Sequence, residues 1–151
     1  MVMMSDRVVR LNNFIQFYLE RNNLEMIPLN MAAKLLSERG ILQDSTSSPG
    51  FPLRRHVLNG TLLGAEKTAN GRWWVHRIDD YSPLVSAERL ARLMGLRFTS
   101  SIYRKFRSEK IPYLRFSRRG ICFRLDHLLN WANESENEEL YRKLSNLQIE
   151  D

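Results

Sequence analysis

The sequence predicts an α+β fold that is mainly α-helical, with small β-hairpins, arranged as two tandem copies of one unit. Three observations lead to this prediction. Apolar residues recur at helical spacing in several segments, and short runs of alternating apolar residues lie between them. The order helix, basic helix, hairpin occurs twice along the chain. A hydrophobic content of 43% in 151 residues is enough for a packed core, in one medium domain or two small ones.

The first predicted element is a helix over residues 6–21. Its apolar residues follow the spacing of a single helical stripe and are Val8, Leu11, Ile15 and Tyr18. Asn22 and Asn23 end the helix. The stripe either docks on the domain that follows or pairs with a second chain, so a homodimer through residues 6–21 is one predicted assembly.

The first copy of the repeated unit comprises two helices and a hairpin, predicted over residues 27–40, 52–59 and 62–78. Gly40 is a stop signal for the first of these helices. The polar stretch over residues 43–50 is a loop that leads to the second helix. The pair Asn70-Gly71 is a strong short-range signal for the turn of a hairpin.

The second copy contains the same elements in the same order, with a helix from Ser86 to Gly95, a basic helix from Thr99 and hairpin strands over residues 114–116 and 121–123. Pro112 ends the basic helix, because proline has no amide proton and disfavours helix at the residue before it. Asp126 is the predicted N-cap of one more short helix. From Asn133 the chain is acidic and polar, and it forms either a loosely held helix or a disordered tail.

An internal repeat follows from aligning the two copies. Residues 27–36 lie over 85–94, residues 53–57 over 102–106, and residues 77–79 over 124–126. The shift falls along the chain from 58 to 49 to 47 positions, since the first copy has a longer loop between its helices. The shared order of elements predicts a duplication.

Charge is unevenly distributed along the chain. The net charge is +6, and residues 84–131 hold 11 Lys and Arg against 3 Asp and Glu, whereas residues 132–151 hold 2 against 6. A basic segment of this kind favours a polyanionic partner, although it can also be an ordinary solvated surface. A single cysteine excludes an intrachain disulfide, and no apolar run approaches the ~20 residues needed to span a bilayer. The N-terminus lacks the apolar core of a signal peptide, so we expect a soluble cytoplasmic protein with no membrane partner.

The candidate DNA-binding residues lie on the basic helix and hairpin of each copy. In the second copy they are Thr99, Ser100, Ser101, Tyr103, Arg104, Lys105, Arg107, Lys110, Arg115, Arg118 and Arg119. In the first copy they are Arg54, Arg55, His56, Lys67 and Arg72. An arginine can bind guanine O6 and N7 together, or it can contact phosphate alone. Hydroxyl groups at a helix start suit a phosphate or simply cap the helix, and Tyr103 contacts the backbone or is half-buried. The two arginines at the hairpin tip suit the DNA backbone or the minor groove.

The sequence offers little support for catalysis. The histidines His56, His76 and His127 are scattered, with no HExxH or Cys-His spacing. The carboxylate pair Asp79-Asp80 lies where a helix N-cap is expected, and Cys122 is an ordinary strand residue. We therefore expect no enzyme, no metal and no cofactor.

Three segments of the second half together carry a family resemblance: VSAERLARLMG, IYRKFRSEKIPYLRF and RRGICFRLDHLLNWA. They resemble the winged helix-turn-helix of phage and plasmid excisionases, the MerR-like DNA-binding domain. The first half departs from the pattern. It has Met31 where glutamate is usual, an inserted loop over residues 41–50, and residues 60–64 in place of a Lys-Ile-Pro turn.

The resemblance covers roughly residues 27–132 and implies a tandem winged helix-turn-helix fold. We expect an N-terminal helix over residues 1–23, winged domains over 24–82 and 83–132, and an acidic tail over 133–151. Small terminase subunits and MerR-type regulators carry similar domains.

The function that the resemblance implies is sequence-preferring binding of double-stranded DNA. The chain would be an architectural factor or recombination directionality factor of a mobile element, located in the cytoplasm of a bacterial or phage-infected cell and associated with the nucleoid. An integrase, a recombinase or another phage protein would be its protein partner. Two alternatives are a transcriptional repressor of a phage or plasmid that acts by occupancy, and a protein-interaction adaptor such as a small terminase subunit.

Overall fold

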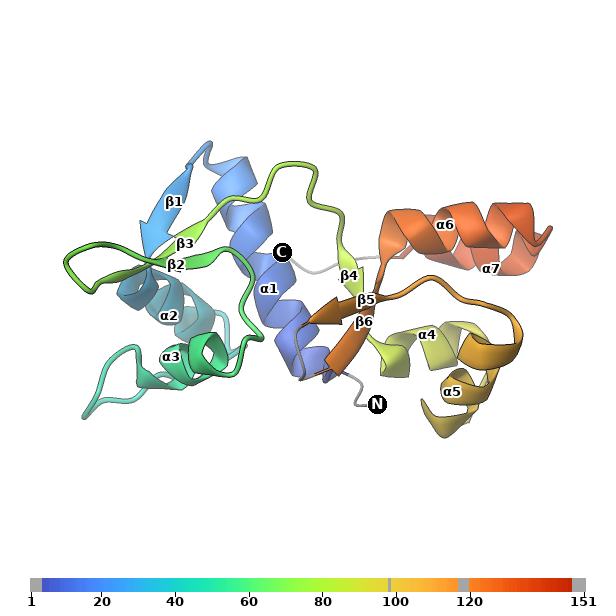
Figure 1. Ribbon diagram of the computed structural model, residues 1–151, viewed down its shortest axis with the longest axis horizontal. Coiled ribbons are helices and arrows are strands. Elements are labelled where there is room, and N and C mark those ends of the chain that lie inside the picture. Colours follow the sequence, from blue (N-terminus) through green and yellow to red (C-terminus); the bar gives the residue numbers. More distant parts are fainter. Residues whose placement is uncertain (1–3, 98, 117–119, 148–151) are drawn as a thin grey trace. The chain divides into compact units, whose positions relative to one another are not determined.

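A computed structural model describes residues 4–97, 99–116 and 120–147 (Figure 1). This part of the chain divides into two compact units. The first unit contains residues 10–81, and the second unit contains residues 82–147 together with residues 4–9. Across the described residues there are seven helices and two small antiparallel sheets of three strands, which confirms the predicted α+β class.

The first unit contains most of α1 (Asp6–Arg21), followed by β1 (Met26–Pro28), α2 (Leu29–Glu38), α3 (Phe51–Leu58), β2 (Ala65–Lys67) and β3 (Trp73–His76). Its sheet has the order β1-β3-β2, with Val75 opposite both Ile27 and Ala65. The apolar face of α1 packs in the core of this unit through Leu11, Phe14, Ile15 and Leu19. Leu11 and Ile15 of the predicted stripe are therefore buried in this unit and Tyr18 packs against its core, and a homodimer through residues 6–21 stays a prediction.

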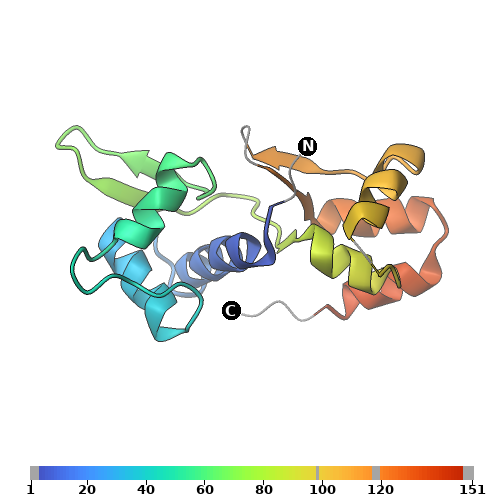
Figure 2. The same cartoon turned by 90° about the horizontal axis from the view of Figure 1, so that it is seen from below.

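The second unit contains β4 (Leu84–Val85), α4 (Ala87–Leu93), α5 (Thr99–Ser108), β5 (Leu114–Phe116), β6 (Gly120–Arg124), α6 (Leu125–Glu134) and α7 (Glu138–Ser145). Its sheet has the order β4-β6-β5. Helices α6 and α7 lie side by side (Figures 1 and 2), and Leu140 and Leu144 of α7 are buried in the core of the unit. The acidic segment after Asn133 thus includes a packed helix. As far as the described residues go, none of α1–α7 combines the length and apolar character of a membrane-spanning helix.

Both units follow the order strand, helix, helix, strand, strand, and in both sheets the third strand lies in the middle. Equivalent positions are buried alike. Ile27 pairs with Val75 in the first unit, and Val85 pairs with Phe123 in the second. This pairing places the last strands 48 positions apart, so the shift of 47 expected for residues 77–79 is wrong by one residue.

The helix expected from Ile27 begins two residues later. Residues Met26–Pro28 form the edge strand β1, and Pro28 has the extended ψ of 147°. Proline is acceptable in an edge strand because the missing amide proton leaves no ladder hydrogen bond unmade. In the second unit the helix expected from Ser86 has this residue as its N-cap, since Ser86 Oγ accepts a hydrogen bond from the N–H of Arg89 at 3.2 Å.

The remaining differences from expectation concern how elements begin and end. Helix α5 ends at Ser108, before Pro112, and Lys110 has a positive φ of 53°. The N-cap of α6 is Arg124, so Asp126 lies in the first turn of that helix instead of capping it. No helix begins at Asp79-Asp80, and Asp80 lies in a turn with φ of 58°.

The hairpin of the first unit has Asn70 and Gly71 in its turn, and residues 69–71 lie between the paired residues Thr68 and Arg72. Gly71 donates its N–H to the carbonyl of Thr68, and Thr68 donates its N–H to the carbonyl of Arg72. Gly71 has a φ of 82°, whereas Asn70 keeps a negative φ. Asn70 and Gly71 are therefore not the two central residues of a type I′ turn. The loop has instead the pattern of a turn followed by one left-handed glycine.

Polar side chains of α1 hold the first unit together. Asn12 Nδ2 donates to the carbonyl of Thr61 at 2.9 Å, and Asn12 Oδ1 accepts from the N–H of Leu63 at 2.8 Å. One turn along, Gln16 Nε2 donates to the carbonyl of His76 at 3.1 Å, and Gln16 Oε1 accepts from the N–H of Ile78 at 2.9 Å. Both amides are buried and bind main-chain groups at the two ends of the hairpin segment.

Candidate nucleic-acid interface

Helix α3 presents an exposed face with two arginines. Leu53 is fully buried and fixes the rotation of the helix, while Arg54 and Arg55 are exposed. The same face also carries the exposed apolar side chains Phe51 and Leu58, which are 52% and 70% exposed. The arginines reach solvent beside apolar surface, which is the mixture that a base edge and its backbone can both contact.

The other predicted residues of the first unit are divided between packing and surface. His56 is half-buried, and its Nδ1 lies 3.1 Å from Thr61 Oγ1. Lys67 is exposed on β2, with its Nζ 5.9 Å from the ring centroid of Trp73. Arg72 is exposed at the end of the hairpin turn.

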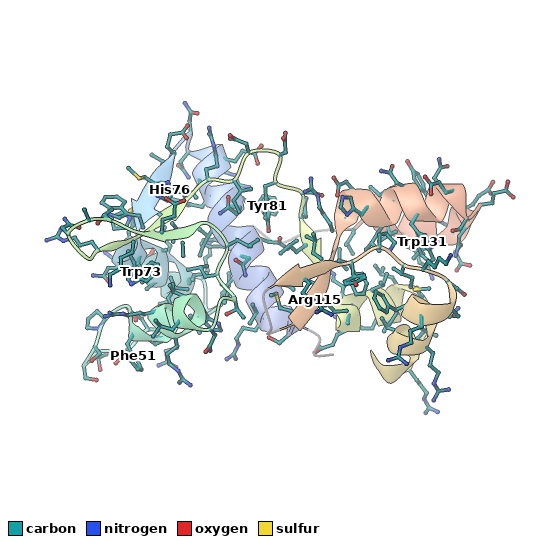
Figure 3. All side chains as sticks on the ribbon, in the orientation of Figure 1. Phe51, Trp73, His76, Tyr81, Arg115 and Trp131 are labelled. Carbon is teal, nitrogen blue, oxygen red and sulfur yellow. The ribbon has the colours of Figure 1, made fainter. Side chains whose placement is uncertain are left out.

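An open groove of about 670 Å³ lies where α2, α3 and the hairpin come together. We call it the first-unit groove, and its defining residues are Asn30, Phe51, Arg54, Arg72, Trp73 and Trp74. Figure 3 labels Phe51 at the start of α3 and Trp73 on β3. The groove is lined by two predicted arginines and by three aromatic residues, so it offers both positive charge and apolar surface.

Helix α5 is the equivalent helix of the second unit. Ile102 is fully buried, and the half-buried Phe106 packs edge-on against Tyr113 with ring centroids 4.5 Å apart. Arg104 and Arg107 are exposed, and neither forms an ion pair with another described residue. Lys105 is half-buried and pairs with Glu109 at 3.2 Å, so its charge is partly neutralised. Helix α5 thus offers two free guanidinium groups three residues apart, on neighbouring positions of one face.

The other predicted residues of the second unit are only partly placed. Lys110, after α5, and Arg115, on β5, are both exposed. Thr99, Ser100, Ser101 and Tyr103 belong to α5, but their side chains are outside the described residues. The hairpin loop with Arg118 and Arg119 also lies outside the described residues.

Two titratable groups of the second unit have shifted pKa values. Burial in β6 raises the pKa of the Cys122 thiol to about 12. Burial opposes ionisation of Asp126 as well, but Arg124 Nε donates to its carboxylate at 2.8 Å, as does the N–H of His127, so the pKa of Asp126 falls below 3.8. Among the described residues, no three His, Cys, Asp or Glu side chains are grouped so that they could hold a metal ion.

The aromatic part of the first-unit groove was not predicted from the sequence. Phe51 lies between the loop expected over residues 43–50 and the helix expected over residues 52–59, and both tryptophans lie in the hairpin expected over residues 62–78. Both tryptophans are half-buried, and Trp73 also packs against the core. An aromatic residue directly before the proline of a basic helix was the signal that could have pointed to Phe51.

Comparison of the chain with protein-family models, with curated proteins and with solved structures found no match. The excisionase-like resemblance therefore rests on the residues quoted for it.

Proposed function

We propose that the protein binds double-stranded DNA with sequence preference, through two tandem winged helix-turn-helix domains. The observation that carries the proposal is common to both units. Each unit presents the second helix of a strand-helix-helix-hairpin arrangement with two exposed arginines: Arg54 and Arg55 on α3, and Arg104 and Arg107 on α5. None of these four forms an ion pair with another described residue.

The dimensions of DNA suit this arrangement. A major groove about 12 Å wide admits one α-helix, whose exposed side chains then face the base edges. In the proposed complex α5 enters the major groove with Arg104 and Arg107, and the hairpin of β5 and β6 lies against the adjacent backbone. Arg115 is exposed on that hairpin and would contact phosphate.

We further propose an architectural role in the recombination of a mobile element, as the excisionase-like resemblance implies. Two DNA-binding units in one chain raise affinity through effective concentration when both engage the same duplex. If the units contact on the order of eight phosphates together, log K should fall with log salt with a slope of about −7.

The test starts with selection of bound fragments from random duplex DNA, followed by footprinting. Titrations of the selected duplex then compare Arg104→Gln and Arg107→Gln with the unmodified chain across a series of salt concentrations. An arginine that reads a base should cost about tenfold or more in affinity, within the ~1–3 kcal/mol typical of such contacts. One that contacts only phosphate should reduce the salt slope by about 1.

The matched control is Arg142→Gln, which removes the same charge from an exposed arginine on α7 of the same unit. We expect this variant to bind like the unmodified chain. Absence of duplex binding at low salt, or equal losses for Arg142→Gln and Arg104→Gln, would refute the proposal.

A further inference from the structure

The first-unit groove contains more aromatic surface than a site for phosphates alone requires. Phe51, in the first turn of α3, is 52% exposed. Burying a phenylalanine side chain would lower the free energy of the folded chain, so its exposure calls for an explanation. Trp73 and Trp74 are half-buried and line the same groove. Large aromatic side chains that stay in contact with solvent beside one another commonly mark a binding surface.

The aromatic side chains are not part of the framework that the two units share. The buried residues Leu53 and Ile102 occupy equivalent positions 49 residues apart, which places Phe51 over Ser100. The 48-residue shift of the last strands places Trp73 over Ile121 and Trp74 over Cys122. Both of those residues are buried in the second unit. The fold therefore forms without this aromatic set.

The charges of the groove define the chemistry of its occupant. Arg54 and Arg72 are exposed, and neither has a carboxylate partner among the described residues. A ligand that combines an anionic group with a flat, apolar ring would match both the cations and the aromatic faces. A nucleotide has this composition, but in a regular duplex its base is stacked on its neighbours and only its edge can be reached.

We propose that the first-unit groove holds an unpaired nucleotide, with its base stacked on Phe51 and its phosphate bound by Arg54 and Arg72. A volume of about 670 Å³ is within the usual size of a small-molecule site and is ample for one base and its sugar phosphate. The inference rests on the proposed binding of nucleic acid, and it adds that the chain recognises duplexes with an extruded or unpaired base.

The experiment uses the full chain and three probes of one sequence. The first is a duplex with a single unpaired 2-aminopurine nucleotide, the second has an abasic nucleotide at that position, and the third is fully paired. We expect the chain to bind the first probe roughly tenfold more tightly than the other two, and to quench 2-aminopurine fluorescence as the base stacks.

Variants then assign the effect to the groove. Loss of an aromatic side chain that stacks on a base weakens binding roughly 5- to 150-fold. Phe51→Ala should therefore abolish the preference for the unpaired base, measured as the ratio of the affinities for the unpaired and the paired probe, and Phe51→Tyr should retain this ratio. The matched control is Leu58→Ala, because Leu58 is an exposed apolar residue of the same helix outside the groove.

The three probes separate this inference from the proposed function. Binding of the paired duplex with no preference for the unpaired base would overturn the inference and leave the proposed function standing, as would a preference that survives in Phe51→Ala. Equal binding of the abasic and 2-aminopurine probes would show that the arginines act without base stacking, which also overturns it. A preference for the unpaired base without measurable binding of the paired duplex would support the inference and refute duplex recognition.

Discussion

Asn12→Ala should destabilise the first unit strongly, because Asn12 is a buried polar residue of α1 that binds two main-chain groups. The side chain is 1% exposed and joins α1 to the segment between α3 and β2. Its Nδ2 donates to the carbonyl of Thr61, and its Oδ1 accepts from the N–H of Leu63. Alanine would leave both main-chain groups without their partner.

The magnitude follows from these two hydrogen bonds. A buried polar group left unsatisfied costs about 1–3 kcal/mol, so two such groups give about 2–6 kcal/mol. Water that enters the vacated space can restore part of this loss, and we expect a decrease of about 3 kcal/mol in the free energy of unfolding. The matched control is Asn22→Ala, which removes one exposed hydrogen bond from Asn22 Nδ2 to the carbonyl of Tyr18 and should cost less than about 1 kcal/mol.

Tryptophan fluorescence can report on the first unit alone. The chain has three tryptophans, of which Trp73 and Trp74 lie in the first unit and Trp131 in the second. In a Trp131→Phe background, urea unfolding followed by fluorescence gives the stability of the first unit by linear extrapolation. A loss for Asn12→Ala no larger than that for Asn22→Ala, with an unchanged m value, would refute the assignment of a stabilising role to the buried amide.

Three further predictions concern packing and pH. Gly64→Ala should lower the free energy of unfolding, measured in urea, by about 3 kcal/mol or more, because a Cβ there would lie 2.3 Å from the carbonyl oxygen of His76. Gly40 also has a positive φ but has open space around it, so Gly40→Ala should cost only about 1 kcal/mol. Leu144→Ala should destabilise the second unit by about 2–5 kcal/mol, measured from Trp131 fluorescence; no loss would mean that α7 is not packed. Cys122 should make the unfolding free energy fall as pH rises above about 9, because its pKa is raised from 9.0 to about 12 on folding and the unfolded chain releases the proton first. The limiting slope is about 1.4 kcal/mol per pH unit, and Cys122→Ala should remove it.

Elements with a sustained period or a specific cap could be predicted from the sequence. The helix over residues 6–21 was placed with its observed bounds, because four apolar positions define its stripe. Ser86 was identified as the start of a helix because a serine directly before an apolar-periodic segment can satisfy a free amide group. The short edge strands β1 and β4 were missed. A strand of two or three residues is too short to show an alternating apolar pattern. The extended form of β1 and β4 depends on pairing with β3 and β6, about 40 to 50 residues away in the chain.

The candidate site could be predicted only where one buried side chain sets which residues of a helix are exposed. The exposure of Arg104 and Arg107 follows from their positions opposite Ile102 on a short helix. The first-unit groove could not be predicted in this way, since its walls come from three segments that only the tertiary fold brings together. The burial of Asn12 and Gln16 was missed for a similar reason. Their partners are main-chain atoms near residues 61–63 and 76–78, which leave no signature in the identity of the side chains.

The attachment of α1 to main-chain atoms has a consequence for how the hairpin segment can change in evolution. Asn12 and Gln16 bind the carbonyl and N–H groups of residues on either side of the hairpin, which every amino acid except proline provides. The side chains of the residues whose main-chain groups bind Asn12 and Gln16 can therefore be replaced without loss of these hydrogen bonds. We expect insertions to be accepted at the tip over residues 68–72, because one residue added next to either attachment point would shift its polar groups out of reach of Asn12 or Gln16. The hairpin turn over residues 68–72 can thus vary in length and charge while the hydrogen bonds of Asn12 and Gln16 are kept.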